Sequence, residues 1–476
     1  MAETATTDEQ PKLKRVMGPG LLLLFVVGDI LGTGVYALTG DVAAEVGGAA
    51  WVPFLVAFLI AAVTAFSYLE LVTKYPQAAG AALYAHKAFG IHFVTFLVAF
   101  VVMCSGITSA STSSQVFGLN FLKGFGLDDS WGTAGVIVIA LLFMFMLALV
   151  NFRGVGESVK LNVVLTVIEI SGLLLVLGTG LWAFTGGGDV DFSRVVAFET
   201  PDDKNTFLAI TAATSLAFFA MVGFEDSVNM AEETKDPVRV FPKVLLGGLS
   251  IAGVVYVLVS IVAVALVPIG VLEESSTPLV EVVKAGAPDL PIDAILPFIT
   301  IFAVANTALI NMLMASRLIY GMARQHVLPP VLGTIHPTRQ SPWAAIIFTT
   351  LIAFGLIIYV SAVASKDTVK ILAGTTSLLL LAVFAVVNVA VLVLRRDVRE
   401  AGGNFKTPTV LPVVGFLTSA YLVLPFSGRP TTQYVLAGIL VVIGVILFGI
   451  TKLINRQLGI HTPGIDDPTH LGKAPD

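Results

Sequence analysis

Four carboxylates interrupt long apolar runs of the chain, at Asp29, Glu169, Glu225 and Asp226. A charged side chain at the centre of a bilayer costs about 2.5–3.5 kcal/mol on insertion scales, so such residues mark functional sites. A carboxyl group removed from water can hold a proton near neutral pH. When ionised, it attracts cations more strongly in a low dielectric than in water. These residues are therefore candidates for exchanging protons or for binding an amine.

Asp29 lies within Gly28-Asp-Ile-Leu-Gly-Thr-Gly34, in the middle of the first apolar run. Glycine costs a helix interior about 1 kcal/mol relative to alanine. Unwound backbone at this depth is tolerated where it lines a cavity, and the half-helix that follows points its positive end at an anion. Close helix packing through small residues is the alternative. Because an acid accompanies the glycines, we interpret the stretch as a binding site.

A second interruption lies in the sixth apolar run, at Phe218-Phe-Ala-Met-Val-Gly-Phe-Glu-Asp226. The sixth run is five runs after the first, an odd number, so the sixth helix enters the membrane from the opposite face to the first. Two similar breaks in oppositely directed helices are typical of an inverted repeat, although the two halves do not visibly repeat in sequence. The alternative for Glu225 and Asp226 is that they already lie at the cytoplasmic end of the helix, which leaves the role of Asp226 open.

These residues are set in a strongly apolar chain, with 56% hydrophobic and 12% charged residues, against about 25% charged in soluble domains. Apolar runs of about 20 residues match the bilayer thickness. We predict an all-α polytopic membrane protein, with polar tails at 1–16 and 456–476 and one transmembrane domain over 17–455. The twelve predicted transmembrane helices are roughly 19–40, 48–73, 92–119, 132–151, 160–184, 206–230, 243–269, 292–322, 342–363, 368–394, 410–427 and 432–454.

Most of the 27 lysine and arginine residues fall on the side of this segmentation that carries both ends of the chain. Positive residues are retained on the cytoplasmic side. We therefore predict a multi-pass protein of the cytoplasmic membrane with both termini in the cytoplasm. The loops on the other side are acidic, for example at Asp128-Asp129 and Glu273-Glu274.

The sequence lacks the signals of several other classes of function. The single cysteine, Cys104, gives no disulfide framework, and the histidines show no metal-ligand spacing, so we expect no metal and no cofactor. No nucleotide-binding motif is present, which argues against ATP, and nothing indicates nucleic acid. We see no nucleophile–base pair of an enzyme and no continuous polar pore of a channel. The expected partners are a small-molecule substrate and the lipid bilayer; the oligomeric state is not indicated.

Five motifs occur in order along the chain. They are the glycine-rich stretch up to Tyr36, Tyr68-Leu-Glu-Leu with Pro76 and Gly80, Gly223-Phe-Glu225, Glu232-Glu-Thr-Lys-Asp-Pro237 with Phe241-Pro242, and Ala305-Asn306 with Ser316-Arg-Leu-Ile-Tyr-Gly-Met-Ala-Arg324. Through these motifs the chain resembles the amino acid–polyamine–organocation permease superfamily over nearly its whole length. Each motif is weak alone, and the order of all five carries the resemblance.

The resemblance implies a fold of the leucine-transporter type. Two inverted five-helix repeats, about 17–185 and 205–395, would hold the substrate between helices one and six, with two peripheral helices in 410–454. In that family the first break holds the substrate carboxylate, which maps onto Gly32, Thr33 and Gly34. The sixth helix would receive the amino group at Gly223, with Phe224 as an aromatic gate assisted by Phe219. Asp29, Ile30 and Glu225 complete the predicted substrate site.

Glu169, on the fifth helix, is the candidate for ion coupling. In several proton-dependent relatives of the superfamily a lysine occupies the matching position, so the acid is a departure. It could carry a proton itself or help to hold Na⁺; we favour the proton. Asn306, in the middle of the eighth helix, is the second candidate for this site. The structural alternative for Glu169 is a carboxyl group hydrogen-bonded to a neighbouring serine or threonine.

These features predict a secondary active transporter that moves amino acids by alternating access and is coupled to protons. The alternatives of the same fold are a transporter of polyamines or other organic amines, an amino acid exchanger, and a nutrient sensor that does not transport. Asp29 and Glu225 would favour cationic substrates if they are ionised.

Overall fold

The computed structural model describes residues 17–77, 80–153, 158–187, 190–201, 204–231, 233–289, 292–324, 326–339, 341–363, 367–396 and 404–457. The predicted tail 1–16 and residues 458–476 of the predicted C-terminal tail lie outside the described residues. Residues 456 and 457 belong to the last helix instead of the tail.

The described chain is helical apart from its loops and two isolated backbone bridges. The α-helices are α1 (Pro19–Ile30), α2 (Thr33–Val46), α3 (Trp51–Lys74), α4 (Gly80–Phe89), α5 (His92–Gly124), α6 (Asp128–Arg153), α7 (Ser158–Trp182), α8 (Thr206–Ala217), α9 (Pro237–Leu266), α10 (Ile269–Glu274), α11 (Pro278–Gly286), α12 (Ile292–Arg324), α13 (Trp343–Val363), α14 (Thr368–Leu394), α15 (Val410–Val423) and α16 (Thr431–Gln457).

Eleven of the predicted spans are matched by helical segments long and apolar enough to cross a bilayer in the described part of the chain. The predicted span 410–427 is the exception, because its helix α15 has only 14 residues. At 1.5 Å per residue it extends about 21 Å, less than the roughly 30 Å of a hydrocarbon core. A 3-10 turn at Pro425–Ser427 follows it.

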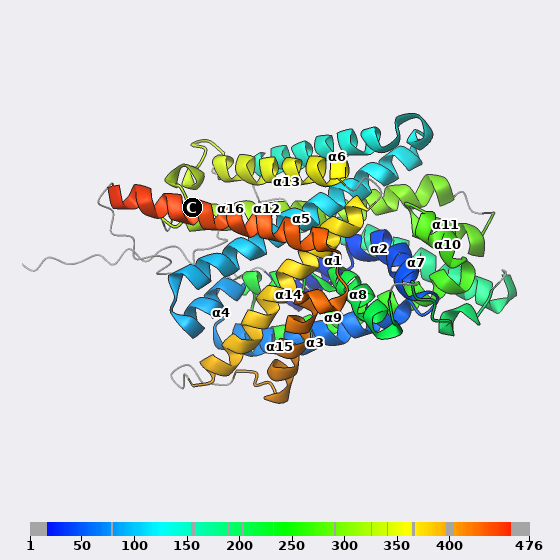
Figure 1. Cartoon of the computed structure of the whole chain (residues 1–476), viewed down its shortest axis with the longest axis horizontal. Helices are drawn as coiled ribbons and strands as arrows, with labels where there is room; N and C mark the ends of the chain where they lie inside the picture. Colours follow the sequence, from blue (N-terminus) through cyan, green and yellow to red (C-terminus); the bar gives the residue numbers. More distant parts are fainter. Residues whose placement is uncertain are drawn as a thin grey trace, which may run out of the picture.

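Other boundaries differ because the apolar pattern does not report capping or short helices. The predicted span 243–269 begins earlier, at Pro237, since proline suits the first turn of a helix. Helices α4, α10 and α11 form in segments that the apolar pattern left as connections. In Figure 1 the long helices run mostly along one direction, with α4 towards one end and α10 and α11 at the other.

The centre of the bundle is formed by the interrupted segments and the helices that flank them. The apolar window of Pro19–Val46 is 78% buried, whereas those of α6 and α16 are each 28% buried. Helix α5 packs against α12 and α14, and α3 packs against α9. Exposed leucines such as Leu142 and Leu181 lie on the outer helices, as expected for surfaces that face lipid. The site therefore has to be sought around α1, α2 and α8.

Candidate functional site

The first predicted break is present between α1 and α2. The α-helix ends at Ile30 and a new helix begins at Thr33, with Gly32 at the junction in a non-helical conformation, at φ −43° and ψ −138°. A Cβ atom on Gly32 would lie 2.0 Å from the Thr307 hydroxyl oxygen. The break therefore needs glycine, because α12 approaches the backbone too closely for a side chain.

The second predicted break is also present and is longer than the first. Helix α8 ends at Ala217 and continues as a 3-10 turn at Phe218–Met221. Val222 is extended, with ψ 143°, and Gly223 has φ 125°, a value that only glycine adopts readily. A second 3-10 turn follows at Asp226–Met230. Regular helix therefore does not resume before Met230.

The two breaks touch each other through their backbones. A Cβ atom on Gly223 would lie 2.8 Å from the carbonyl carbon of Asp29, and one on Gly34 would lie 2.4 Å from the Cα atom of Ala220. Segments separated by about 190 residues in the sequence thus meet in the middle of the bundle. This contact, which the sequence could not give, supports treating the two breaks as one site.

The exposed backbone groups of the breaks are partly satisfied and partly free for a ligand. Tyr256 donates its hydroxyl hydrogen to the carbonyl of Ile30, and the N–H of Gly223 donates to Glu225 Oε2 at 2.9 Å. No side chain caps the start of α2 at Gly32. The first N–H groups of a helix have no partner within it, so the start of α2 can bind an anion such as a carboxylate.

A small cavity, which we name the central cavity, lies where the breaks meet. About 10 Å³ is open to the centre of a water molecule, roughly the space of one water. Of the predicted substrate residues, its lining contains Asp29, Ile30, Thr33, Gly34, Phe219 and Gly223. The lining also contains Ser109, Val222, Asp226, Thr307 and Asn311. Most of the predicted substrate residues are thus brought together.

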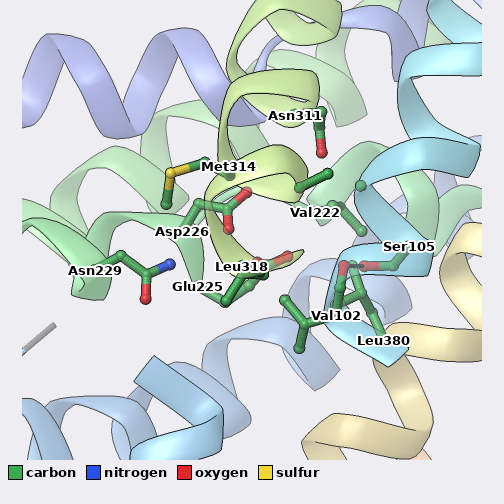
Figure 2. A pocket seen from close by; sticks show the side chains of 12 residues that line it. Val102, Ser105, Val222, Glu225, Asp226, Asn229, Asn311, Met314, Leu318 and Leu380 are labelled. Carbon is green, nitrogen blue, oxygen red and sulfur yellow. Dashed lines mark hydrogen bonds between the residues drawn. The ribbon is translucent and has the colours of Figure 1, made fainter. Parts of the chain in front are cut away.

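A second cavity of about 20 Å³, the lower cavity, adjoins the first and shares Val222, Asp226 and Asn311 with it. Figure 2 shows Glu225, Asp226 and Asn229 on one side of this cavity, with Val102, Ser105 and Leu380 on the other. Asp226, whose role the sequence left open, therefore contacts both cavities. Glu225 lines only the lower one.

The electrostatic character of the two cavities is acidic. Of the described residues that line them, three are carboxylates (Asp29, Glu225 and Asp226) and none is a lysine or arginine. Asp29 is only 4% exposed, and its Oδ2 atom has no hydrogen-bond partner in the described structure. Buried polar groups normally have partners. An unpaired carboxylate oxygen at the cavity therefore suits a ligand that brings a proton or an ammonium group.

The two predicted ion-coupling residues lie on facing helices beside the first break. Asn162 donates to Asn306 Oδ1 at 3.0 Å, and Asn306 lies 3.5 Å from the hydroxyl of Thr166. Glu169 follows Thr166 on α7 by three residues, is fully buried and has no partner for either carboxylate oxygen in the described structure. The hydrogen bond to a serine or threonine that would explain Glu169 structurally is thus not observed.

Two predicted residues lie away from the cavity linings. Gly32 borders the cavity only through its contact with Thr307, as described above. Phe224 is fully buried, and its ring centroid lies 5.7 Å from that of Tyr68 and 5.3 Å from that of Phe384. Its ring thus belongs to an aromatic cluster and is absent from the linings of both cavities, while Phe219 reaches the central one.

The sequence analysis missed five polar residues that line these cavities: Ser105, Ser109, Asn229, Thr307 and Asn311. The two on α12 could have been found, because Thr307 and Asn311 lie four residues apart, on the helix face next to Asn306. The serines of α5 could not, because that helix carries seven hydroxyl residues between Ser105 and Ser114 and most bond to their own helix.

A larger hollow of about 890 Å³, the vestibule, lies at the end of the molecule that carries α10 and α11. Its lining includes Ala37, Asp41, Gln115, Glu273 and Lys370. No residue lines both the vestibule and the central cavity. The central cavity and the vestibule are therefore lined by separate sets of residues.

Comparisons with known proteins bear on the family of the chain. The sequence profile of the amino acid permease family matches residues 22–448. The chain is 24% identical to the methylthioribose transporter of Bacillus subtilis over 94% of this chain and 95% of that protein. It is 27% identical to a branched-chain amino acid permease of Lactococcus lactis, over 93% and 95%. It is 29% identical to the chloroplastic cationic amino acid transporter 9 of Arabidopsis thaliana, over 68% of this chain and 58% of that protein.

Proposed function

Because the chain belongs to the amino acid permease family, we propose that it is a secondary active transporter that carries amino acids across the cytoplasmic membrane by alternating access, driven by protons. The observation that carries the proposal is the meeting of two broken segments around a small cavity, with Gly223 against the backbone of Asp29. A helix that only spanned the membrane would have no need of either break.

The arrangement we propose has twelve crossings, built as two inverted five-helix repeats, with α15 and α16 as the last pair. The breaks in the first and sixth segments support the inverted repeat. With both termini in the cytoplasm, the vestibule opens to the outside. The structure then corresponds to a state in which the substrate site is closed on that side.

For an amino acid substrate, the start of α2 would hold the carboxylate and the acids of the cavity would face the amino group. The uncapped N–H groups at Thr33 and Gly34 support the first contact, and Asp29 and Asp226 support the second. The relatives named for methylthioribose, branched-chain and cationic amino acids are 24–29% identical to the chain, so their names do not select one substrate.

The acidic lining favours one alternative specifically. Three carboxylates without a lysine or arginine beside them would attract a basic amino acid, a polyamine or another organic amine if they are ionised. An exchanger of such compounds would use the same site. The fully buried Glu169, with both oxygens unpartnered in the described structure, supports a role in ion coupling, and we propose the proton as the coupling ion because a buried carboxyl group can hold a proton near neutral pH.

Two experiments test the proposal in order. A thermal-shift screen of the purified protein against amino acids and polyamines identifies the ligand, because a ligand that binds only the folded state raises the melting temperature. The ligand is then radiolabelled, and its entry into proteoliposomes is measured with and without an inward proton gradient.

Accumulation above the equilibrium level only when the proton gradient is present is the expected result. Accumulation that follows a Na⁺ gradient alone would remove the proton from the mechanism. Counterflow separates a carrier from a sensor, because preloaded ligand exchanges with external ligand only through a carrier. Binding without counterflow would overturn transport itself.

A further inference from the structure

Arg429 lies in the loop between α15 and α16 and is only 7% exposed. No ion pair of Arg429 occurs in the described structure. Burying a charge is costly unless it is paired and hydrogen-bonded. Something other than a carboxylate must therefore stabilise this guanidinium.

The guanidinium donates to five acceptors, which matches the five N–H donors of an arginine side chain. The acceptors are Leu422 O (2.8 Å), Gly374 O (2.8 Å), Gln433 Oε1 (3.1 Å), Ser377 Oγ (2.9 Å) and Ser215 O (3.4 Å). They come from α8, α14, α15 and α16. One side chain thus links the last two helices to the core of the bundle.

Two of these acceptors explain how the charge is tolerated. Leu422 lies in the last turn of α15, and Ser215 lies in the last turn of α8. The C-terminal end of a helix carries about half a negative charge, and its last carbonyls lack helical partners. Two such ends together match the single positive charge of Arg429, so they replace a carboxylate.

The loop holds α8 at further points. Thr211 donates its hydroxyl to Ser427 O at 3.2 Å, and Gly428 packs so closely that a Cβ atom there would lie 3.1 Å from that of Ala212. On α14, Ser377 donates to the same Ser215 carbonyl at 2.5 Å. Residues 427–429 therefore lie along α8 between Leu208 and Ser215.

The end of α8 leads directly into the substrate site. Phe219 follows Ser215 by four residues and lines the central cavity. We propose that Arg429 is a positioning residue of the transport cycle. It fixes the C-terminal end of α8, and with it Phe219 and the sixth-segment break, when the central cavity is closed. The α15–α16 hairpin is then part of the moving machinery. This proposal rests on the transport function proposed above.

A distance measurement tests, without any transport assay, whether Arg429 fixes α8 relative to α16. Spin labels are attached at Phe207→Cys on α8 and Val435→Cys on α16, both exposed positions, in a Cys104→Ser background. We expect one narrow distance distribution for the protein with Arg429 and a broad one for Arg429→Met. Arg429→Lys should give an intermediate distribution, because lysine keeps the charge but lacks the planar guanidinium with its five N–H donors. Ser419→Ala is the control, because Ser419 lies in the same hairpin and its hydroxyl has no hydrogen-bond partner in the described structure. An unchanged distribution in Arg429→Met would overturn the proposal.

Transport kinetics then separate positioning from simple folding. Per folded molecule, Arg429→Met should raise the apparent KM by about tenfold, the effect of losing hydrogen bonds from a charged donor, with partial recovery in Arg429→Lys. Ser377→Ala should act in the same direction, and its effect should not add to that of Arg429→Met. Reduced yield with unchanged KM and turnover in all three variants would mean a structural role only, against the proposal.

If Arg429→Met does not fold, Arg429→Lys and Ser377→Ala carry both measurements. If the unmodified protein does not transport, the function proposed above fails, and the spin-label distances still decide whether Arg429 holds α8.

Discussion

The first and sixth segments are both broken, but they are broken in different ways. The first loses its helix only at Leu31 and Gly32, with regular helix on both sides. The sixth has no α-helix from Phe218 to Met230 and instead combines two 3-10 turns with an extended residue. A short gap preserves two half-helices with usable ends, whereas a long one leaves many backbone groups that depend on neighbours.

The glycines of the two breaks also differ in whether they lie against side chains or against backbone. Added Cβ atoms at Gly28 and Gly32 would lie 1.9 Å and 2.0 Å from the hydroxyl oxygens of Thr166 and Thr307, which belong to side chains. One at Gly223 would meet the backbone of Asp29 instead. Side chains can be shortened, whereas backbone cannot. At Gly28 and Gly32 the first break is thus fitted against side chains of α7 and α12, whereas at Gly34 and Gly223 the two segments meet through backbone.

This comparison indicates that the contact between Gly223 and the backbone of Asp29 defines the site in this structure. In the alternating-access cycle proposed above, the backbone of the sixth segment would separate from that of the first, while the first would remain against α7 and α12. We therefore expect substitutions in the sixth break to have the larger effects.

Gly223→Ala should have the largest effect. An alanine would need φ 125°, a strained conformation for any residue with a Cβ atom, and that Cβ would collide with the backbone of Asp29. We expect ligand-dependent stabilisation in the thermal-shift assay to be lost and uptake to fall by about 100-fold or more, since each 1.4 kcal/mol is a factor of ten. Gly247→Ala on α9, where a Cβ would meet nothing within 4 Å, is the matched control. Near-normal uptake by Gly223→Ala would show that transport does not depend on the close contact between Gly223 and Asp29.

Glu169→Gln should have the next largest effect, and only on coupling. The amide keeps the shape of the side chain but cannot release a proton. We expect gradient-driven accumulation to fall to the equilibrium level while counterflow and binding persist. Thr349→Ala on α13, a buried polar position whose hydroxyl bonds to its own helix, serves as control. Unchanged accumulation would assign coupling to another carboxylate, with Asp226 next because it contacts both cavities.

Much of this arrangement follows from local sequence, and the rest does not. Glycines beside Asp29 and Glu225 predicted both breaks, because glycine and charge are costly in a simple spanning helix. The length of the sixth break was not predictable, since Phe218 to Val222 is as apolar as a helix requires. The long helices around them followed from apolar length. The short length of α15 and the presence of the short helices α4, α10 and α11 did not, because hydropathy alone does not reveal them.

Contacts between distant segments were beyond the sequence as well. Nothing local indicates that Gly223 rests on Asp29, or that Phe224 turns towards Tyr68 while Phe219 faces the cavity. Arg429 was an ordinary positive residue of an external loop by its position in the sequence. Its burial depends on how α8, α14, α15 and α16 pack around it, which is a property of the packed bundle.

Gly32→Ala tests the side-chain character of the first break. The nearest obstacle to a Cβ atom at Gly32 is the Thr307 hydroxyl oxygen at 2.0 Å, which belongs to a side chain that can be shortened. We expect uptake to fall about tenfold, consistent with overpacking of about 1–3 kcal/mol. The double variant Gly32→Ala with Thr307→Ala should recover most of the lost uptake, reaching nearly the uptake of Thr307→Ala alone. If the second substitution brings no recovery, the first break is held by backbone as the sixth is, and the distinction disappears.

Asp29→Asn should have the smallest effect, and it concerns charge alone. The amide keeps the size of the side chain at the end of α1, where the carbonyl carbon of Asp29 faces Gly223, so neither break should change. An ionised Asp29 would attract a cationic ligand by Coulomb energy, which a partly screened site limits to a few kcal/mol. We expect the apparent Kd of a cationic ligand to rise several-fold more than that of a neutral one, measured by thermal shift or by competition for uptake. Equal losses for both ligands would mean that Asp29 is protonated in the closed site. The acidic lining would then reflect proton binding by the first break and carry no preference for amines.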